Sequence, residues 1–521
     1  MNDSIETISL VDATLDLQEQ HQAGATRSHS RSHGQFFTPP SVASFMAGLL
    51  TLPKREIRFL DPGAGSGILT AAICDRIAKM KSPRTVHVEL YETERSVLPM
   101  LRECLESCRL EMRRTGHALT FELHETDFIL SAAPQASLFD SHAKGAFDAV
   151  IMNPPYFKIG KDSTYARAMD NVVHGQPNIY ALFMALAADL LKPGGELVAI
   201  TPRSFCNGPY FRSFRRWYFD RMSLNHLHLF ESRTDTFRHA KVLQESVISL
   251  ASRARQSDIV RLTTSEGQEL TAKRHARSLR ADHILDNTSG DMVVRIPEGP
   301  VDSEVIAFVE KWSHRFRDIG LRVSTGPVVA FRARPFLRAE MNGHTVPLLS
   351  VHNVHAFETR WPVEKGNKPI AFLVAHDSAP LLLPARNYVL LRRFTAKEEK
   401  RRLVASSFLR RNSITPHVAL ENHLNYVYHD KRELSEAECT GLSALFNSAL
   451  LDRYFRTISG NTQVNAAEVR SMPLPPLSQI ADIGAKLGKG PPRDRAEIDQ
   501  LVLSELNVDR ALRNYLEEHI H

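Results

Sequence analysis

Two consecutive prolines limit what this chain can fold into more than any other feature of its sequence. Pro154 and Pro155 follow Asn153, and the residues before them, 147–152, form an apolar run. Proline lacks a backbone N–H donor and fixes φ, so a strand over this run must end in a rigid turn. The turn places an amide side chain, a proline carbonyl and the ring of Tyr156 next to one another. It can therefore accept hydrogen bonds from an amino group on a planar ring and stack on that ring. A plain strand-ending loop with a packed tyrosine is the alternative interpretation.

Strand-like and helix-like segments alternate on both sides of this turn. The predicted strands are 57–61, 85–91, 119–124, 146–152, 196–201, 224–230 and 245–250, and the predicted helices are 67–80, 96–114, 179–191 and 211–219. Strands interleaved with helices predict an α/β fold with a doubly wound, mostly parallel sheet of seven strands. Ligands of such sheets bind beyond the carboxyl ends of the strands. Asp61, Glu92, Asp127 and Asn153 fall at those ends.

The length of 521 residues predicts two or three domains. Residues 1–33 are expected to form a disordered polar tail, 34–255 carry the alternating pattern, 256–300 resemble a linker or excursion, and 301–521 form a second, mixed α+β domain. The short β-like pieces of the second domain are 321–324, 347–351, 388–391 and 426–428, and a capping box at Ser435 and Glu438 opens a helix.

Composition and charge exclude several classes of protein. The chain has 43% apolar and 24% charged residues, which are the values of a soluble globular protein. No run of 18 apolar residues predicts a membrane span, and no apolar signal segment begins the sequence. The five cysteines lack Cys-x-x-Cys spacing, which favours reduced thiols in a cytoplasmic protein over disulfides or zinc. The net charge of +6 fits a polyanionic partner without proving one.

A glycine-rich segment, residues 59–67 (Phe-Leu-Asp-Pro-Gly-Ala-Gly-Ser-Gly), ends the first strand and opens a helix. Glycines at alternate positions allow a ligand to approach the backbone closely. A dinucleotide, a phosphate or no ligand at all could explain this turn, although it lacks the Lys-Ser/Thr end of a P-loop. Asp61 narrows the choice, because an acid repels phosphate and attracts a cationic ligand. The amino group and the sulfonium of S-adenosylmethionine are such cations.

Two further acids stand at the ends of the next strands. Glu92 follows the second strand, where an acid can accept hydrogen bonds from both ribose hydroxyls of a nucleoside. Glu94 is a close competitor for that role. Asp127 follows the third strand and could accept a hydrogen bond from an adenine amino group. Taken alone, Glu92 or Glu94 could equally be a solvated acid at the end of a strand, and Asp127 alone is better explained as an ordinary loop acid.

The motifs together resemble the amino-directed DNA methyltransferases, in which Asp-Pro-x-x-Gly-x-Gly precedes Asn-Pro-Pro-Tyr. Upstream, residues 34–40 (Gly-Gln-Phe-Phe-Thr-Pro-Pro) resemble the motif that closes over the methionine end of the cofactor in the gamma class of adenine methyltransferases. Downstream, residues 229–248 resemble the target-base region of that family. Residues 387–394 and 460–465 resemble the recognition half of restriction–modification methyltransferases. The order of the motifs also matches the gamma class.

This resemblance implies a Rossmann-like methyltransferase domain over residues 34–255 and a DNA target-recognition domain over residues 301–521. The implied reaction is adenine-specific (N6) methylation, in which S-adenosylmethionine is the methyl donor. The acceptor would be the exocyclic amino group of an adenine flipped out of duplex DNA. Methylation would protect the DNA from a cognate restriction endonuclease, a separate protein.

The resemblance also implies a role for each residue of the site. Asn153 and Pro154 would accept hydrogen bonds from the target amino group, and Tyr156 would stack on the base. Phe237 would flank the other face of the base, although simple packing explains Phe237 equally well. The residues implied to contact the cofactor are Thr38 at its carboxylate, Asp61, Gly63 and Gly65 at its amino-acid part, Glu92 at its ribose, Asp127 at its adenine, and Pro155. No metal ion is needed for this reaction.

A basic stretch lies in the second domain. Residues 386–411 hold nine Lys or Arg residues and two Glu residues. A solvated helix face explains such a run of charge. In a recognition domain, Arg392, Arg393, Lys400 and Arg401 would instead be expected to contact the DNA backbone.

Two other functions stay open on the sequence alone. Asn-Pro-Pro-Tyr also occurs in methyltransferases that act on RNA bases or on protein glutamine, although residues 34–40 and the large C-terminal half argue against them. A non-catalytic DNA-binding specificity component is the second alternative, which the intact acid–glycine and Asn-Pro-Pro-Tyr motifs disfavour. The expected location is the bacterial cytoplasm, on double-stranded DNA and away from membranes.

Overall fold

The computed structural model of this chain describes residues 9–24, 37–52, 54–132, 145–172, 175, 178–230, 246–265, 270, 275–286, 290–297, 299–363, 368–395, 399–459, 463–488 and 494–518. The chain divides into two compact units, Met1–Val294 and Arg295–His521. No helix among the described residues is long and apolar enough to cross a membrane.

The first unit is built on a nine-stranded sheet in the order β3-β2-β1-β4-β5-β7-β6-β8-β9. Its strands are β1 (Glu56–Asp61), β2 (Thr85–Tyr91), β3 (Ala118–His124), β4 (Phe147–Met152), β5 (Leu191–Pro202), β6 (Ser223–Phe230), β7 (Ser246–Ser252), β8 (Ile259–Ser265) and β9 (His275–Arg280). The strands from β3 to β5 are parallel, and β7 runs antiparallel between β5 and β6. The predicted doubly wound, mostly parallel α/β fold is therefore confirmed.

The strand order reverses between β1 and β4. In doubly wound sheets the crevice at such a reversal is where ligands bind, beyond the carboxyl ends of the strands. β4 is buried along most of its length, with only Asp148 partly exposed, as expected for an apolar strand covered on both faces. The turn that contains Asn153 begins directly after this strand, so the buried strand fixes the position of the turn.

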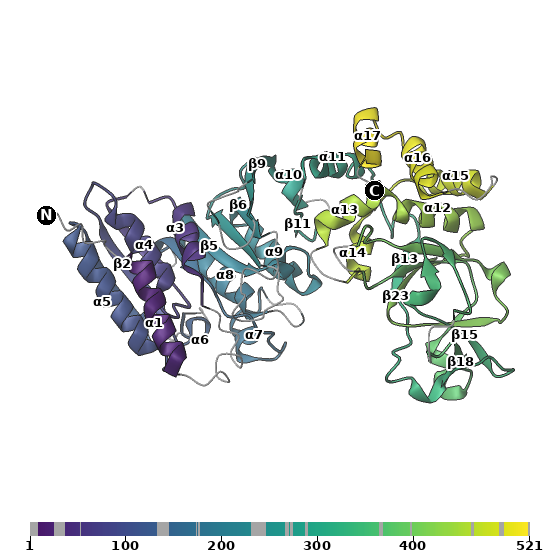
Figure 1. The fold of residues 1–521 in the computed structure, drawn as a ribbon, viewed down its shortest axis with the longest axis horizontal. Coiled ribbons are helices and arrows are strands. Elements are labelled where there is room, and N and C mark those ends of the chain that lie inside the picture. The colour runs from purple at the N-terminus through teal and green to yellow at the C-terminus, as the bar shows by residue number, and fades with distance from the viewer. Residues whose placement is uncertain are drawn as a thin grey trace. The chain divides into compact units, whose positions relative to one another are not determined.

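Two groups of helices pack on this sheet. The first group consists of α1 (Leu10–Gly24), α3 (Pro40–Leu49), α4 (Ile68–Ala78) and α5 (Leu98–Arg114), which contact one another and lie side by side in Figure 1. The second consists of α6 (Phe128–Ala132), α7 (Thr164–Ala168), α8 (Ile179–Leu190) and α9 (Arg212–Phe219). α8 is apolar on all sides and is buried apart from Asp189, as expected for a helix inside a core.

The N-terminal segment corrects the prediction of a disordered tail over residues 1–33. Its described part contains α1, a helix of 15 residues that packs against α4 and α5. The buried face of α1 includes Leu10, Thr14 and Gln18, spaced four residues apart. Two of these three side chains are polar, so the apolar periodicity that announces an amphipathic helix is weak here.

The range 256–300 was expected to be a linker and instead extends the sheet. β8 pairs in parallel with β6, and β9 pairs antiparallel with β8, so the sheet has nine strands where seven were predicted. β9 is an exposed edge strand that carries Arg277 and Arg280, and a polar edge strand looks like a linker in sequence. The helix α10 (Ala281–Ile284) and the short strands β10 (Leu285–Asp286) and β11 (Val293–Val294) follow, and the unit ends at Val294.

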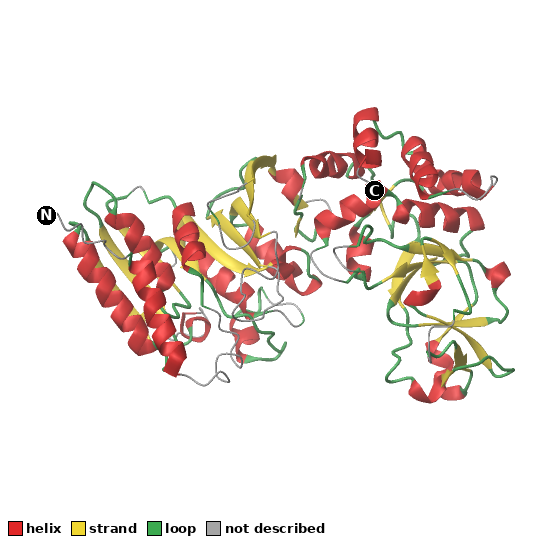
Figure 2. Ribbon diagram, in the orientation of Figure 1, coloured by secondary structure: helices red, strands yellow, loops and turns green. Residues whose placement is uncertain are grey.

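The second unit combines two main sheets with several helices, which Figure 2 shows in yellow and red. The six-stranded sheet has the order β13-β23-β20-β21-β17-β16 and the five-stranded sheet has the order β14-β18-β15-β22-β19. Their strands are β13 (Leu321–Thr325), β14 (Leu337–Arg338), β15 (Thr345–Leu349), β16 (Val354–His355), β17 (Phe357–Thr359), β18 (Ala371–Leu373), β19 (Leu382–Pro384), β20 (Tyr388–Arg392), β21 (Ala405–Phe408), β22 (His417–Leu420) and β23 (Leu424–His429). A further pair joins β12 (His314–Arg315) to β24 (Pro473–Leu474). The predicted mixed α+β domain is confirmed.

The α-helices in the described part of the second unit pack partly on the six-stranded sheet and partly on one another. They are α11 (Pro300–Val309), α12 (Glu436–Asn447), α13 (Ala449–Ile458), α14 (Ala466–Ser471), α15 (Leu477–Gly488), α16 (Arg495–Glu505) and α17 (Arg510–Glu518). The predicted capping box begins α12, since Ser435 N donates to Glu438 Oε2 at 2.8 Å and Glu438 N donates to Ser435 Oγ at 3.1 Å. A Cβ at Gly441 would lie 1.8 Å from Ile480 O, so this glycine lets α12 and α15 pack closely.

Candidate active site

A cavity of about 220 Å³ opens beside the carboxyl ends of β1, β2 and β4. Its walls come from the glycine loop after β1, the acid segment after β2, the loop before α6, the turn after β4 and the start of α8. Of the residues predicted to bind the cofactor, the cavity is lined by Thr38, Gly63, Gly65, Glu92, Asp127 and Pro155. Asn153 and Pro154, predicted to be catalytic, line it as well. The fold therefore brings segments from more than a hundred residues of sequence to one cavity.

The glycine loop is shaped by left-handed backbone conformations and by close packing. Gly65 has a φ of 54° and Gly67 a φ of 85°, values that glycine adopts without strain. A Cβ at Gly67 would lie 2.9 Å from Cys104 Sγ and from Leu101 Cδ1, both on α5. The buried Cys104 therefore packs directly against this loop. All five cysteines are free and buried.

Glu92 holds the glycine loop to the end of β2. Its Oε2 accepts a hydrogen bond from Gly65 N at 2.8 Å, and its Oε1 accepts hydrogen bonds from Thr93 N at 2.8 Å and Glu94 N at 2.7 Å. Burial raises the pKa of this carboxyl, and the three backbone amides lower it in part. Glu94, the competitor for the ribose role, also lines the cavity. Its carboxylate accepts hydrogen bonds from the backbone and hydroxyl of Ser96.

Asp61 lies beneath the glycine loop and does not line the cavity. It is completely buried, and its Oδ2 accepts a hydrogen bond from Thr70 Oγ1 at 3.0 Å. Burial, with a smaller contribution from the charge of Glu92, raises the pKa of Asp61 to about 7. This position supports the loop and supplies a charge that depends on pH, and it does not favour the direct contact predicted for Asp61.

Asp127 connects two structural elements at the far side of the cavity. Its Oδ1 accepts a hydrogen bond from Leu130 N at 2.9 Å, and its Oδ2 accepts one from Tyr165 Oη at 2.8 Å. The neighbouring Phe128 is buried and packs against Phe183 of α8, with a distance of 5.3 Å between ring centroids. Carboxylate and aromatic groups therefore meet at this end of the cavity.

The side chain of Asn153 is oriented by two hydrogen bonds. Its Nδ2 donates to Thr38 Oγ1 at 3.0 Å, and its Oδ1 accepts a hydrogen bond from Tyr156 Oη at 2.6 Å. Thr38 is buried and stands just before α3, whose first residue is Pro40, at the position where helices tolerate proline best. The segment 34–40 is described only from Phe37 onward.

The neighbouring rings of Tyr156 and Phe157 differ in their position relative to the cavity. The Tyr156 hydroxyl also lies 2.9 Å from the carbonyl oxygen of Ile200 on β5, and its ring packs edge-on against Tyr180. Tyr156 does not line the cavity, whereas Phe157 lines it and is 37% exposed. Phe237, predicted to flank the base, lies outside the described residues.

Several cavity residues were missed by reasoning from sequence. These are chiefly aromatic and apolar residues, namely Phe37, Tyr91, Phe128, Phe157, Tyr165, Ile179 and Phe183. Phe37, Phe128 and Phe157 each stand next to a predicted site residue in the sequence, so adjacency was a usable signal. Ile179 and Phe183 belong to an apolar helix, where nothing in the sequence separates cavity residues from core residues.

The described residues also include one group that could hold a metal ion. Ligand atoms of Glu89, Glu122 and His124 lie within 4.8 Å of one another on β2 and β3. Glu89 Oε1 accepts a hydrogen bond from Tyr91 Oη at 2.9 Å, and His124 Nε2 lies 3.3 Å from the same oxygen. The three side chains are outside the cavity lining. That the predicted methyl transfer needs no metal ion stays a prediction.

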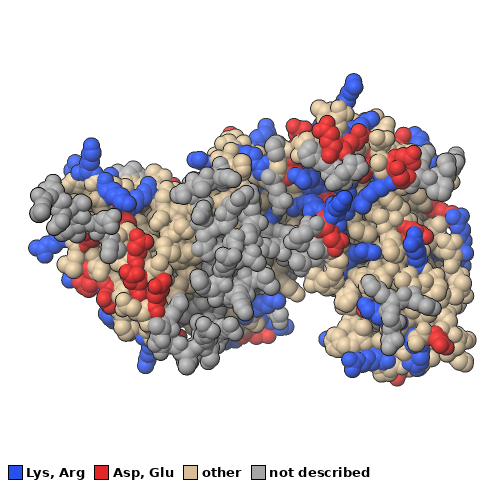
Figure 3. Space-filling model, viewed as in Figure 1, with Lys and Arg blue, Asp and Glu red and all other residues tan. Residues whose placement is uncertain are grey.

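The four residues predicted to contact the DNA backbone occupy unlike positions in the second unit. Lys400 is exposed. Arg392 is partly exposed and its Nε donates to Val354 O at 2.7 Å, and Arg393 donates to Asn422 O at 3.1 Å. On the face shown in Figure 3, the Lys and Arg side chains of this unit are interspersed with Asp and Glu.

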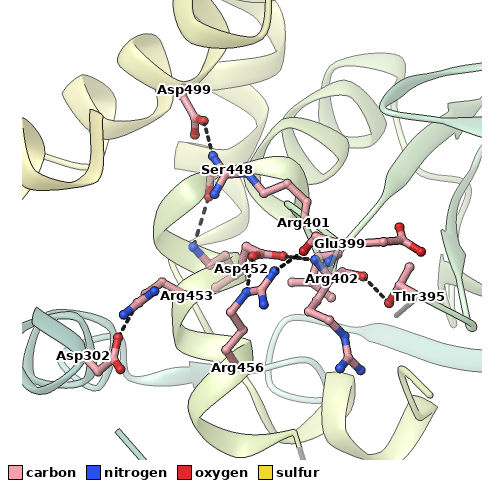
Figure 4. A network of polar contacts seen from close by, with 12 residues as sticks. Asp302, Thr395, Glu399, Arg401, Arg402, Ser448, Asp452, Arg453, Arg456 and Asp499 are labelled. Carbon is pink, nitrogen blue, oxygen red and sulfur yellow. Dashed lines mark hydrogen bonds and ion pairs between the residues drawn. The ribbon is translucent and has the colours of Figure 1, made fainter. Parts of the chain in front are cut away.

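Arg401 is part of a buried polar network (Figure 4). Its guanidinium lies 3.2 Å from Asp499 Oδ2, and the two side chains are 10% and 1% exposed. In the same network, Asp452 Oδ1 accepts hydrogen bonds from Arg402 N at 2.6 Å and from Leu403 N at 2.8 Å. Because its charge is already paired inside the fold, Arg401 is poorly placed for the predicted contact with a phosphate.

Comparison with known proteins agrees with this geometry. The family model for the Eco57I restriction-modification methylase matches residues 97–237. Over 481 residues the chain is 33% identical to the Type II methyltransferase M.PstI of Providencia stuartii, an alignment that covers 91% of this chain and 93% of that protein. Over 460 residues it is 34% identical to the Type II methyltransferase M.BsuBI of Bacillus subtilis, covering 87% of this chain and 89% of that protein.

Among solved structures, the Type IIL restriction-modification enzyme MmeI, in complex with DNA, has a TM-score of 0.50 and 10% sequence identity. That alignment covers 98% of this chain and 73% of MmeI, and it supports the fold alone. The two Type II relatives align with both units over nearly their whole length. The chain therefore belongs to the Type II DNA methyltransferases of restriction–modification systems.

Proposed function

We propose that this protein transfers a methyl group from S-adenosylmethionine to the exocyclic amino group of an adenine flipped out of duplex DNA. The modification would protect the DNA from a cognate restriction endonuclease. One observation carries the proposal. The amide of Asn153, which follows the buried β4, is held by Thr38 and Tyr156 at the wall of the cavity. The residue that would bind the target amine is thereby placed next to the proposed cofactor site.

The cavity lining fits S-adenosylmethionine. Apolar side chains of Phe128, Ile179 and Phe183 can cover the faces of an adenine, and Asp127 stands beside them as a hydrogen-bond acceptor. Glu92 lies at the end of the next strand, where its carboxylate would accept hydrogen bonds from ribose hydroxyls. The acids also suit the cationic part of the cofactor. When bound, S-adenosylmethionine would supply an electrophilic methyl group.

Asn153 and Pro154 would activate the target amino group. An aromatic amine is a poor nucleophile because its lone pair is delocalised into the ring. Acceptors at Asn153 Oδ1 and at the Pro154 carbonyl would bind the amino hydrogens and stabilise the positive charge that develops on nitrogen. Asn153 Oδ1 has two lone pairs, so it can accept from the base and from Tyr156 together. Methyl transfer would form a nitrogen–carbon bond to the base and break the carbon–sulfur bond of the cofactor, and one amino proton would pass to water.

The target base would lie next to the turn after β4. A base must leave the duplex to expose its amino group, and contacts with aromatic rings offset part of that cost. We propose Tyr156 as one such contact and Phe237 as the other. The partly exposed ring of Phe157 lies in the same turn, lines the cavity and packs edge-on against Tyr165, the residue that donates to Asp127, so it would border the adenine end of the cofactor.

The second unit would bind the DNA target. Lys400, which is exposed, is the best placed of the four candidate phosphate contacts, because the guanidinium groups of Arg392 and Arg393 already donate to Val354 O and Asn422 O. Each contact with a phosphate releases a counterion, so replacing Lys400 should make DNA binding less sensitive to salt. Arg401 serves better as a structural residue because Asp499 neutralises it.

The test is methylation of duplex DNA by Asn153 variants of the full chain. Asn153→Ala should abolish methyl transfer while S-adenosylmethionine binding by calorimetry and DNA binding both survive. Asn153→Asp keeps an acceptor oxygen and should retain more activity than Asn153→Ala. Methylation-sensitive sequencing of DNA from cells expressing the protein should report N6-methyladenine at one short site. Retained methylation by Asn153→Ala, or activity on RNA without activity on duplex DNA, would contradict the proposal.

A further inference from the structure

An exposed aromatic ring marks one end of the six-stranded sheet. Phe394 follows β20, and its side chain is 42% exposed. The ring of His423 packs against it edge-on with 4.9 Å between centroids, and the Arg393 guanidinium lies 5.8 Å from the Phe394 centroid. The ring is therefore oriented by its neighbours although its outer part faces solvent.

Backbone and side-chain contacts join three segments at this point. Arg393 N donates to His423 O at 2.9 Å, Arg393 Nη1 donates to Asn422 O at 3.1 Å, and Arg393 Nη2 lies 3.3 Å from Gln463 Oε1. Phe394 and Gln463 also form an isolated antiparallel bridge. The end of β20, the turn between β22 and β23, and the segment before α14 thus form one surface, with Arg393 as the link.

We propose that Phe394, Asn422 and His423 form a base-reading surface for duplex DNA, an inference that rests on the proposed function. The surface combines an apolar ring with an imidazole and an amide, groups that contact the thymine methyl and the polar edges of bases in the major groove. His423 Nδ1 lies 3.4 Å from Glu421 Oε1, which orients the imidazole. The guanidinium of Arg393 supplies positive charge beside this surface, which suits a polyanionic partner.

The experiment compares DNA discrimination by variants of the full chain. We measure discrimination as the ratio of methylation rates on the target sequence and on duplexes with one altered base pair. Phe394→Ala and His423→Ala should each lower this ratio by about tenfold. Cofactor binding should stay at the wild-type level. Ile414→Ala and His376→Ala serve as matched controls, since both side chains are exposed in the same unit. These controls should keep wild-type discrimination.

Phe394→Tyr keeps the aromatic ring and should retain most of the discrimination. This result would distinguish loss of a contact with the bases from a general loss of stability. Wild-type discrimination in both Phe394→Ala and His423→Ala would overturn the inference. A wild-type protein that methylates no DNA would instead remove the proposed function on which the inference depends.

A second inference concerns the N-terminal helix. α1 is anchored to α4 at its first residues, because Leu10 N and Val11 N donate to the two carboxylate oxygens of Asp75 at 2.9 and 3.1 Å. Thr14 Oγ1 lies 3.3 Å from Cys104 Sγ. One turn further, Gln18 Nε2 donates to Ser66 Oγ at 2.6 Å, and both side chains are buried. Ser66 belongs to the glycine loop and lines the cavity.

We infer that Gln18 is a positioning residue for the cofactor, acting through Ser66. The glycine loop receives support from Glu92 on one side and from Gln18 on the other. A buried amide donor that loses its partner is costly, so the pair restricts the rotamer of Ser66 and the path of the loop. This inference also rests on the proposed cofactor.

Gln18→Ala should raise the KM for S-adenosylmethionine by about threefold to tenfold, the range for one hydrogen bond. The kcat and the KM for DNA should stay unchanged. Gln20→Ala is the matched control, because Gln20 is exposed on the same helix. Combining Gln18→Ala with Ser66→Ala should cost no more than the larger single effect, since both remove the same contact.

Additive effects of the two substitutions, or equal rises in KM for DNA and for the cofactor, would overturn this inference. Thermal unfolding of Gln18→Ala and Gln20→Ala tests whether general loss of stability explains the result. Absence of S-adenosylmethionine binding by the wild-type protein would reject the proposed cofactor itself.

Discussion

Asn153 Nδ2 donates a hydrogen bond to Thr38 Oγ1 at 3.0 Å, joining two segments that are 115 residues apart in the sequence. The turn after β4 is thereby connected to the segment that precedes α3. Thr38 can influence both cofactor binding and the orientation of the Asn153 amide. Neither sequence motif, the one with Asn153 or the one with Thr38, predicts this hydrogen bond by itself.

Thr38→Val keeps the shape of the side chain and removes the hydroxyl that accepts this hydrogen bond. We expect kcat to fall about tenfold, the upper end for the loss of one hydrogen bond, because the Asn153 amide becomes free to rotate. Thr38→Ser keeps the hydroxyl and should stay near the wild-type value. Steady-state methylation of duplex DNA measures both, and a fully active Thr38→Val would show that the contact has no role.

Tyr156→Phe removes the hydroxyl that lies 2.6 Å from Asn153 Oδ1 and 2.9 Å from Ile200 O, while the ring remains. We expect a loss of several-fold in kcat, since one neutral hydrogen bond contributes about 1 kcal/mol. Tyr156→Ala should lose more, because base–aromatic stacking is worth roughly 1–3 kcal/mol. Single-turnover methylation distinguishes the two variants. Equal activities would argue against stacking by Tyr156.

Asp61 should make stability depend on pH. Its pKa is raised by burial from 3.8 to about 7 in the folded protein, so in that interval the folded state holds a proton that the unfolded chain releases. This contribution to the free energy of unfolding is present at acid pH and is lost as the pH rises through about 7. Urea unfolding across this range should show the slope in the wild type and a weaker slope in Asp61→Asn. An unchanged slope would reject the assignment.

Asp61 should also link cofactor binding to protons. A cationic ligand stabilises the ionised carboxylate, so binding below pH 7 should release a proton and become tighter as the pH rises. Calorimetry in buffers of different ionisation enthalpy measures this release. Binding with no proton release in the wild type would count against a cationic ligand near Asp61.

Asp452 should be a major source of stability in the second unit. It is 1% exposed and accepts hydrogen bonds from two backbone amides and from Arg456 Nε at 2.9 Å. Asp452→Ala leaves these buried donors without their acceptor, and we expect a loss of about 3 kcal/mol in the free energy of unfolding. Asp482→Ala, an exposed position on α15, is the control and should change stability by less than about 0.5 kcal/mol. Chemical denaturation compares the two variants. An unaltered midpoint for Asp452→Ala would contradict the structural role of the network.

Local chemistry explains why much of the first unit could be predicted. The apolar runs of the first unit predict buried strands. The prolines after β4 and the glycines after β1 have strong backbone preferences, and they mark where two of the parallel strands end. Asn153, Gly65, Glu92 and Asp127 therefore come together by the rules of doubly wound sheets. The N-terminal helix escaped prediction because polar residues such as Gln18 form part of its buried face. The last two strands escaped because β9 is a polar edge.

The sequence by itself determined the strand ends and the residues that stand on them, since turn chemistry and apolar patterning act over a few residues. Only the tertiary structure decided which partners those residues have. Asp61 lies beneath its loop, Gln18 reaches the same loop from another helix, and Arg401 is neutralised by Asp499 from 98 residues away. Such pairings depend on how distant elements pack, because burial and hydrogen bonding are set by neighbours in space.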